Sequence, residues 1–104
     1  MDFLAELYFI STENGGRKTP AKNGYRPHIK FDFEEMMTSG QQIYVNKDLV
    51  FPGDSVIAEM NILSRPYFEG KLDVGMNFNF YEGPTLIGNG KILEIVNQSL
   101  IKKI

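Results

Sequence analysis

The feature that most constrains the fold of this chain is a repeated alternation of apolar and polar residues with a period of two. The alternation is clearest over residues 72–80, and it recurs over residues 55–63 and 28–33. Along residues 72–80 one face would carry five apolar side chains, namely Leu72, Val74, Met76, Phe78 and Phe80. Successive side chains of a strand point to opposite faces, so this pattern predicts β-strands with one buried face.

Three further segments complete the expected set of strands. Residues 3–10 are apolar at nearly every position except Glu6. This composition predicts a strand covered on both faces, or one that lies at a subunit or domain contact. Residues 86–87 and 91–96 predict a last strand that Gly88-Asn89-Gly90 interrupts, through a bulge or a sharp bend.

Turn signals separate these segments. Residues 33–38 predict a turn or an irregular extension, and Ser39-Gly40 predicts a break in the middle of the chain. Three tripeptides have the composition of tight turns: Asn14-Gly15-Gly16, Pro52-Gly53-Asp54 and Glu82-Gly83-Pro84. About six strands in one domain over residues 1–104 then need closure into a barrel or packing as a sandwich.

Composition excludes several classes of site. The chain has no Cys, so disulfides, thiol catalysis and Cys-based zinc sites are impossible. A single His, His28, rules out a His-rich metal site, and we expect neither a metal nor a cofactor. No apolar run approaches the roughly 20 residues of a membrane span, and the N-terminus lacks the basic region of a signal peptide. We therefore expect a cytoplasmic protein without a membrane segment.

Positive charge is concentrated in one segment, although the net charge is only −2. Residues 14–31 hold five of the eleven basic residues and no acid, whereas the rest of the chain has six bases against thirteen acids. Such a segment can face phosphates or an acidic protein partner. A solvated loop would carry the same charges, so charge alone leaves the function open.

The sequence does not match the common motifs of catalytic sites. There is no phosphate-binding loop of the G-x-x-x-x-G-K-[ST] type. His28 has no Ser nucleophile motif or orienting carboxylate nearby in the sequence, which favours a histidine at the surface or rim. Glu34 and Glu35 would point to opposite faces of a strand and could not converge on one bond. We predict no catalytic residue, and a small enzyme that uses His28 is the remaining catalytic alternative.

The most specific motif lies in residues 15–27, which read G-G-R-K-T-P, a short spacer, and then N-G-Y-R-P. It strongly resembles the C-terminal barrel, the third domain, of bacterial elongation factor Tu, whose pattern is G-G-R-H-T-P and then G-Y-R-P. Residues 51–54 are similar to the M-P-G-D turn of that family, and residues 82–90 to its closing hairpin, E-G-x-x-T-V-G-x-G. The resemblance implies an all-β fold, a six-stranded antiparallel closed β-barrel.

The resemblance also implies a role. In that family the barrel is a non-enzymatic arm that helps a second barrel to hold the T stem of aminoacyl-tRNA, and it meets the nucleotide-exchange factor. The positions that match functional residues of the family, together with neighbouring residues of the same motifs, form the predicted binding set: Arg17, Lys18, Thr19, Tyr25, Arg26, His28, Glu82 and Gly83. Within it, residues 17–19 match the loop beside the tRNA and the G domain, and His28 stands at a Gln that touches the T stem. Residues 82–83 match an acidic-Gly pair that reads a T-stem base pair.

Some residues depart from the family pattern and weaken the expectation of RNA binding. Lys18 replaces a His, and Tyr81 and Asp32 each stand at a family Arg. Loss of cations weakens binding to nucleic acid, because affinity depends on the number of neutralised phosphates. The two other domains of the factor have no counterpart, so we expect no nucleotide binding by this chain alone. We therefore expect a translation-related protein partner that engages residues 14–31, with the tRNA T stem as the alternative ligand of the same segment.

Overall fold

Six antiparallel strands close into a barrel in the computed structural model, which describes residues 1–103. Around the barrel, neighbouring strands follow the order β1 (Phe3–Phe9), β6 (Ser55–Ile62), β4 (Thr38–Tyr44), β3 (His28–Phe31), β7 (Asn77–Glu82) and β8 (Thr85–Ile95). All six pairings are antiparallel, including the β1–β8 pairing that closes the barrel. The predicted all-β, six-stranded antiparallel closed barrel is confirmed.

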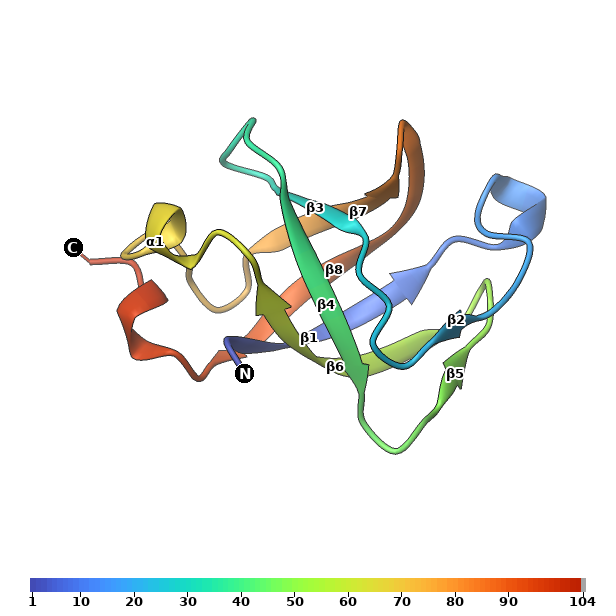
Figure 1. Cartoon of the computed structure of the whole chain (residues 1–104), viewed down its shortest axis with the longest axis horizontal. Helices are drawn as coiled ribbons and strands as arrows, with labels where there is room; N and C mark the ends of the chain where they lie inside the picture. The colour runs from blue at the N-terminus through green and yellow to red at the C-terminus, as the bar shows by residue number, and fades with distance from the viewer. Residues whose placement is uncertain (104) are drawn as a thin grey trace.

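Small elements cover the two ends of the barrel (Figure 1). At one end lie the 3-10 turn η1 (Thr12–Asn14) and a two-stranded sheet of β2 (Ala21–Lys22) and β5 (Leu49–Val50). At the other end lie α1 (Arg65–Phe68) and the 3-10 turn η2 (Gln98–Leu100). None of the helices among residues 1–103 combines the length and apolarity needed to cross a membrane.

The core consists of the inward faces of the strands, as the period-two pattern predicted. The predicted apolar face of residues 55–63 is buried along β6 at Val56, Ala58, Met60 and Ile62. Phenyl rings fill one part of the interior, and Phe78 meets the ring of Phe3 edge to face at a centroid distance of 5.9 Å. Aromatic pairs with this geometry stabilise a core beyond the area that they bury.

The expectation that residues 3–10 are covered on both faces is wrong. Along β1 only alternate residues are buried, while Glu6 and Tyr8 on the other face are exposed. The backbone of β1 pairs with β6 on one side and with β8 on the other. Its outer face nevertheless lies at the barrel surface, because a closed barrel covers only the face that points inward.

The strand expected over residues 72–80 begins later, at Asn77. Gly75 has φ = +86°, a conformation that interrupts an extended strand, and Val74 is 58% exposed. Leu72 is buried for another reason, because its backbone forms a parallel bridge with Ile101 near the C-terminus. The alternating pattern over residues 72–80 therefore covers two different elements, the isolated bridge at Leu72 and the start of strand β7.

Two predicted breaks are also wrong, because the glycines involved lie inside strands. Ser39 and Gly40 belong to β4, a strand that the sequence did not predict. Of the residues 33–38 expected to be irregular, 33–37 are irregular, but Thr38 is the first residue of β4. β8 runs without interruption through Gly88 and Gly90. The pairing of β7 with β8 does skip one residue, but this bulge lies at Ile87, before the three residues where the sequence placed the interruption.

The glycines of β8 are required by the phenyl rings opposite them. A Cβ atom on Gly88 would lie 2.3 Å from Cζ of Phe80, and one on Gly90 would lie 2.3 Å from Cζ of Phe78. These separations are far below van der Waals contact, so no side chain fits at either position. The rings of β7 occupy the volume that side chains of β8 would otherwise fill.

The position of Phe78 leads to a first prediction, a test of the strand register. Phe78 is fully buried and its neighbour Asn77 is exposed. We expect Phe78→Ala to lower the free energy of unfolding by about 3–5 kcal/mol, because it removes a large core side chain and leaves a cavity. Asn77→Ala, the matched control, should change it by no more than about 0.5 kcal/mol. Chemical denaturation measures both, and equal losses would contradict the register.

A second prediction concerns the close approach of β8 to the rings. We expect Gly90→Ala to cost about 1–3 kcal/mol of unfolding free energy, because the new methyl group overlaps the ring of Phe78. Asn89→Ala, on the exposed face of the same strand, is the control. The cost of Gly90→Ala should shrink when Phe78 is already Leu, as a double-mutant cycle measures. Strict additivity of the two substitutions would show that the ring does not set the requirement for glycine.

Candidate binding site

The loop that follows β1 folds back on the end of the barrel. Gly15 ends the turn η1 with φ = +98°, in the left-handed region that glycine adopts without strain. A Cβ atom on Gly16 would lie 1.9 Å from the carbonyl oxygen of Ile10, so the two backbones are in direct contact there. The two glycines together turn the chain so that Arg17 lies beside the β7–β8 turn.

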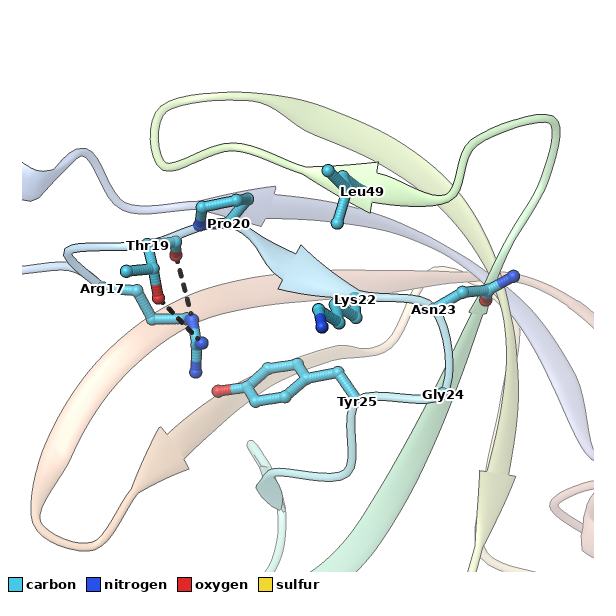
Figure 2. Close-up of a pocket in the computed structure, with 8 residues that line it drawn as sticks. All are labelled: Arg17, Thr19, Pro20, Lys22, Asn23, Gly24, Tyr25 and Leu49. Carbon is cyan, nitrogen blue, oxygen red and sulfur yellow. Dashed lines mark hydrogen bonds between the residues drawn. The ribbon is translucent and has the colours of Figure 1, made fainter.

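Arg17 is held in place by several partners. Its guanidinium forms an ion pair with Glu82, which lies at the end of β7. Nε of Arg17 donates to the carbonyl oxygen of Thr19 at 3.2 Å, and a terminal nitrogen donates to the Thr19 hydroxyl at 3.3 Å (Figure 2). The Thr12 hydroxyl donates to the backbone carbonyl of Arg17 at 2.6 Å. The planar fork of Arg is suited to this combination of partners.

Tyr25 completes the arrangement around Glu82. Its hydroxyl donates to the same carboxylate oxygen that pairs with Arg17, and the guanidinium carbon of Arg17 lies 4.8 Å from the centre of its ring. Figure 2 shows the Tyr25 hydroxyl pointing toward Arg17. Burial of the ring raises the pKa of the Tyr25 phenol above its ordinary value, and the hydrogen bond to Glu82 raises this pKa further. We call these three residues the Arg17–Tyr25–Glu82 cluster.

A surface groove of about 610 Å³ runs alongside the cluster, next to the β2–β5 sheet. Apolar atoms from Pro20, Leu49 and the Tyr25 ring line it together with the amine of Lys22 (Figure 2). The full lining is Arg17, Thr19, Pro20, Lys22, Asn23, Gly24, Tyr25 and Leu49. A mixture of apolar walls and a few polar groups is typical of binding sites.

The structure brings together only part of the predicted binding set. Arg17, Thr19, Tyr25 and Glu82 are linked by hydrogen bonds at one end of the barrel, and Gly83 follows at once in the turn. The two remaining cations of the set, Lys18 and Arg26, are exposed and belong neither to the cluster nor to the groove lining.

His28 lies apart from these residues, on the outer face of β3. It is exposed, and its register partners on the neighbouring strands are Ser39 and Tyr81. Its imidazole forms no hydrogen bond with another group in residues 1–103. Within the described part of the chain, no hydroxyl and no carboxylate is therefore hydrogen-bonded to His28.

The groove includes residues that sequence reasoning missed. Leu49 was not singled out, because nothing local to its sequence marks it. Asn23 belongs to the N-G-Y-R-P motif but was not placed in the predicted binding set. Leu49 reaches the groove only through the pairing of β5 with β2, which sets Leu49 opposite Lys22. Lys22 could have been chosen from the sequence, because it is one of the five cations of the basic segment.

Two of those five cations have acidic neighbours. Arg17 is paired with Glu82, and Nζ of Lys30 lies 3.9 Å from a carboxylate oxygen of Glu35. Within residues 1–103, the other three cations of the segment form no ion pair: Lys18, Lys22 and Arg26. The positive charge that remains available to a partner is therefore smaller than the sequence count of five.

The shared carboxylate yields a third prediction. We expect Glu82→Gln to lower the pKa of Tyr25, because the substitution removes the negative charge that disfavours the phenolate. Tyrosinate absorbance in an alkaline titration measures this pKa, and subtraction of the matched Tyr25→Phe variant isolates the signal of Tyr25. An unchanged titration in Glu82→Gln would mean that the phenol does not interact with Glu82 in solution.

The sign of the linked stability effect follows from the raised pKa. The folded state prefers the neutral phenol, so this contribution to stability is fully present below the unfolded pKa of about 10 and is lost as the pH rises through the folded value. Above a pH of about 10, the unfolding free energy of the wild type should therefore decline more steeply than that of Tyr25→Phe. Parallel curves would contradict the assignment.

One comparison identifies the family of the chain. The family model described as the elongation factor Tu C-terminal domain matches residues 1–96, which is most of the sequence. The matched region includes all six barrel strands, because β8 ends at Ile95, and it contains every residue of the Arg17–Tyr25–Glu82 cluster. The chain belongs to the elongation factor Tu C-terminal domain family.

Proposed function

We propose that the chain is a non-catalytic, translation-related binding module that engages a protein partner through the groove beside the Arg17–Tyr25–Glu82 cluster. Membership of the family supports the coarser part of this proposal. The observation that carries the finer part is the internal pairing of Arg17 with Glu82. This pairing neutralises Arg17 and leaves Lys22 as the one cation of the groove lining without an ion pair within residues 1–103, where a larger basic patch would have suited nucleic acid.

The chemistry of the groove favours a protein over RNA. Pro20, Leu49 and the Tyr25 ring offer apolar contact area, and Lys22 offers one ammonium group for an acidic or carbonyl partner. Tyr side chains are enriched at protein interfaces because a rigid ring loses little conformational entropy on binding. RNA binding, in contrast, depends on many cations that neutralise phosphates.

RNA remains the alternative ligand, on one specific observation. Three cations of the basic segment, Lys18, Lys22 and Arg26, form no ion pair within residues 1–103. Each cation that neutralises a phosphate contributes about 0.7–0.9 to the slope of log K against log salt. Three contacts support binding at low salt that fades toward physiological salt.

The experiment compares partners captured by the tagged full chain from a cell lysate, with and without ribonuclease. We expect a protein of the translation machinery to be retained after ribonuclease treatment. The double variant Lys22→Ala, Leu49→Ala should reduce its recovery about tenfold, because the variant removes the ammonium group and the apolar wall of the groove. Both side chains lie at the surface, so the fold should be unaffected.

The control is Lys47→Ala, Leu63→Ala, which changes the same residue types at exposed positions outside the groove. Labelled aminoacyl-tRNA is titrated in parallel across a range of salt concentrations. Tight tRNA binding near physiological salt that is lost in Lys18→Ala, Lys22→Ala would overturn the proposal and make RNA the ligand. Equal recovery of the protein with the groove variant and with the wild type would also overturn it.

A further inference from the structure

We infer that the chain carries a second binding site, for an acidic peptide segment of a partner protein, at the end of the barrel that holds the C-terminus. A groove of about 380 Å³ lies there, lined by Phe33, Glu34, Lys71, Met76, Lys102 and Lys103. We call it the C-terminal groove. In Figure 1 the C-terminus and α1 lie together at the end of the barrel opposite η1 and β2, so this groove is separate from the one beside Tyr25.

The segment that builds one side of the groove is firmly attached to the barrel. Leu100 is fully buried, and its carbonyl oxygen accepts from the backbone N–H of Leu72 at 2.8 Å. The backbone N–H of Lys102 in turn donates to the carbonyl oxygen of Leu72 at 2.7 Å. Lys102 and Lys103 follow the last residue of the family match, residue 96. The groove therefore depends on residues outside the matched family region.

Three ammonium groups around the groove form no ion pair with any residue of the described chain, residues 1–103. They belong to Lys71, Lys102 and Lys103, which come from two separate segments. Nζ of Lys71 lies 3.8 Å from the centre of the Tyr67 ring, which fixes it near the groove. Three cations against one carboxylate in the lining leave an excess of positive charge at this concave surface, which attracts a ligand with carboxylates.

The single carboxylate in the groove lining, Glu34, cancels only part of this charge. One oxygen of Glu34 accepts from the Tyr67 hydroxyl at 2.7 Å, and the other accepts from the backbone N–H of Met36 at 3.2 Å. The hydrogen bond from Tyr67 and the positive charge of Lys71 lower the pKa of Glu34, so this carboxylate is ionised and offsets one of the three lysine charges. It braces the 32–37 loop against α1 and forms no ion pair with the lysines within residues 1–103.

The floor of the groove is apolar and exposed. Phe33 is 45% exposed, and one face of its ring is stacked on Phe31 with the ring centres 5.9 Å apart. Met76 lies beside it in the lining, and Met36 and Met37 are exposed on the same loop as Phe33. Flexible Met side chains adapt to the shape of an incoming apolar side chain. An apolar residue of the ligand can therefore be seated between lysines that hold its acidic neighbours.

Nearby acids favour a peptide over RNA as the occupant. Asp32, Glu35 and Asp73 flank the segments that form the groove, and all three are exposed. A continuous chain of phosphates would run past these carboxylates and be repelled, because like charges brought together at an interface are unfavourable. A peptide can carry its carboxylates only where they meet the lysines.

The test is a selection of random displayed dodecapeptides on the immobilised full chain. We expect the enriched peptides to combine acidic residues with an aromatic or aliphatic one. Binding of a labelled enriched peptide, measured by fluorescence anisotropy, should weaken about tenfold or more in Lys71→Ala, Lys102→Ala, Lys103→Ala, because three surface ion pairs are lost. The matched control is Lys18→Ala, Lys47→Ala, Lys91→Ala, which removes the same charge from exposed lysines elsewhere and should leave binding unchanged.

Two further arms separate the components of the site. Phe33→Ser should weaken the same peptide, because it removes the apolar floor, whereas Lys22→Ala, Leu49→Ala should not, because those residues belong to the other groove. Failure of this proposal is thereby distinguishable from failure of the proposed function. No enrichment of acidic peptides, or equal loss in both lysine triple variants, would overturn the inference. The inference would also be overturned if a labelled uridine-rich RNA bound the wild type and this binding were lost in Lys71→Ala, Lys102→Ala, Lys103→Ala.

Discussion

The absence of a side chain at two positions of β8 is the constraint on which the rest of the structure depends. Six strands enclose a narrow space, and such small barrels fill their interior by setting large side chains against small ones. Gly88 and Gly90 leave room for the rings of Phe80 and Phe78. The ring of Phe80 then meets that of Phe9 at a centroid distance of 5.0 Å. A side chain at either glycine would displace a ring and alter the packing of strands that are distant in the sequence.

This packing extends to the binding site. The ring of Phe9 lies 6.3 Å from that of Tyr25, so the core supports one face of Tyr25, while its hydroxyl and the Arg17 guanidinium share the Glu82 carboxylate. The loop after β1 is therefore attached to the barrel by a core contact and by the cluster together. Arrangements in which a fixed ring positions a charged group lose little entropy on binding, because the geometry is already set.

A different interaction holds the opposite end of the barrel. The carboxylate of Asp2 is almost fully buried, and it accepts hydrogen bonds from the backbone N–H of Ile62 at 2.8 Å, from Nε of Arg65 at 2.8 Å and from the Asn97 amide at 3.2 Å. A buried carboxylate is stable only where such donors satisfy it. This one carboxylate joins the N-terminus, α1 and the segment that leads to η2, and so it also supports the end that carries the C-terminal groove.

Local sequence patterns could predict the strands and their inward faces, because the period of two is a property of each segment alone. The same reasoning failed for β4 and β8, because a glycine marks either a turn or a close approach, and only the opposite strand decides which. A Cβ atom on Gly40 would lie 3.0 Å from the Ile29 side chain on the neighbouring strand, and Gly88 lies opposite Phe80. The motif residues Arg17, Tyr25 and Glu82 could be chosen from the family pattern, but the pairing of Arg17 with Glu82, 65 positions apart, required the fold. That pairing changes the meaning of the basic segment, because a count of cations treats Arg17 as free whereas the structure neutralises it. The charge available to partners is thus set by tertiary contacts: of the cations that form no ion pair within residues 1–103, Lys22 lines one groove and three lysines line the other.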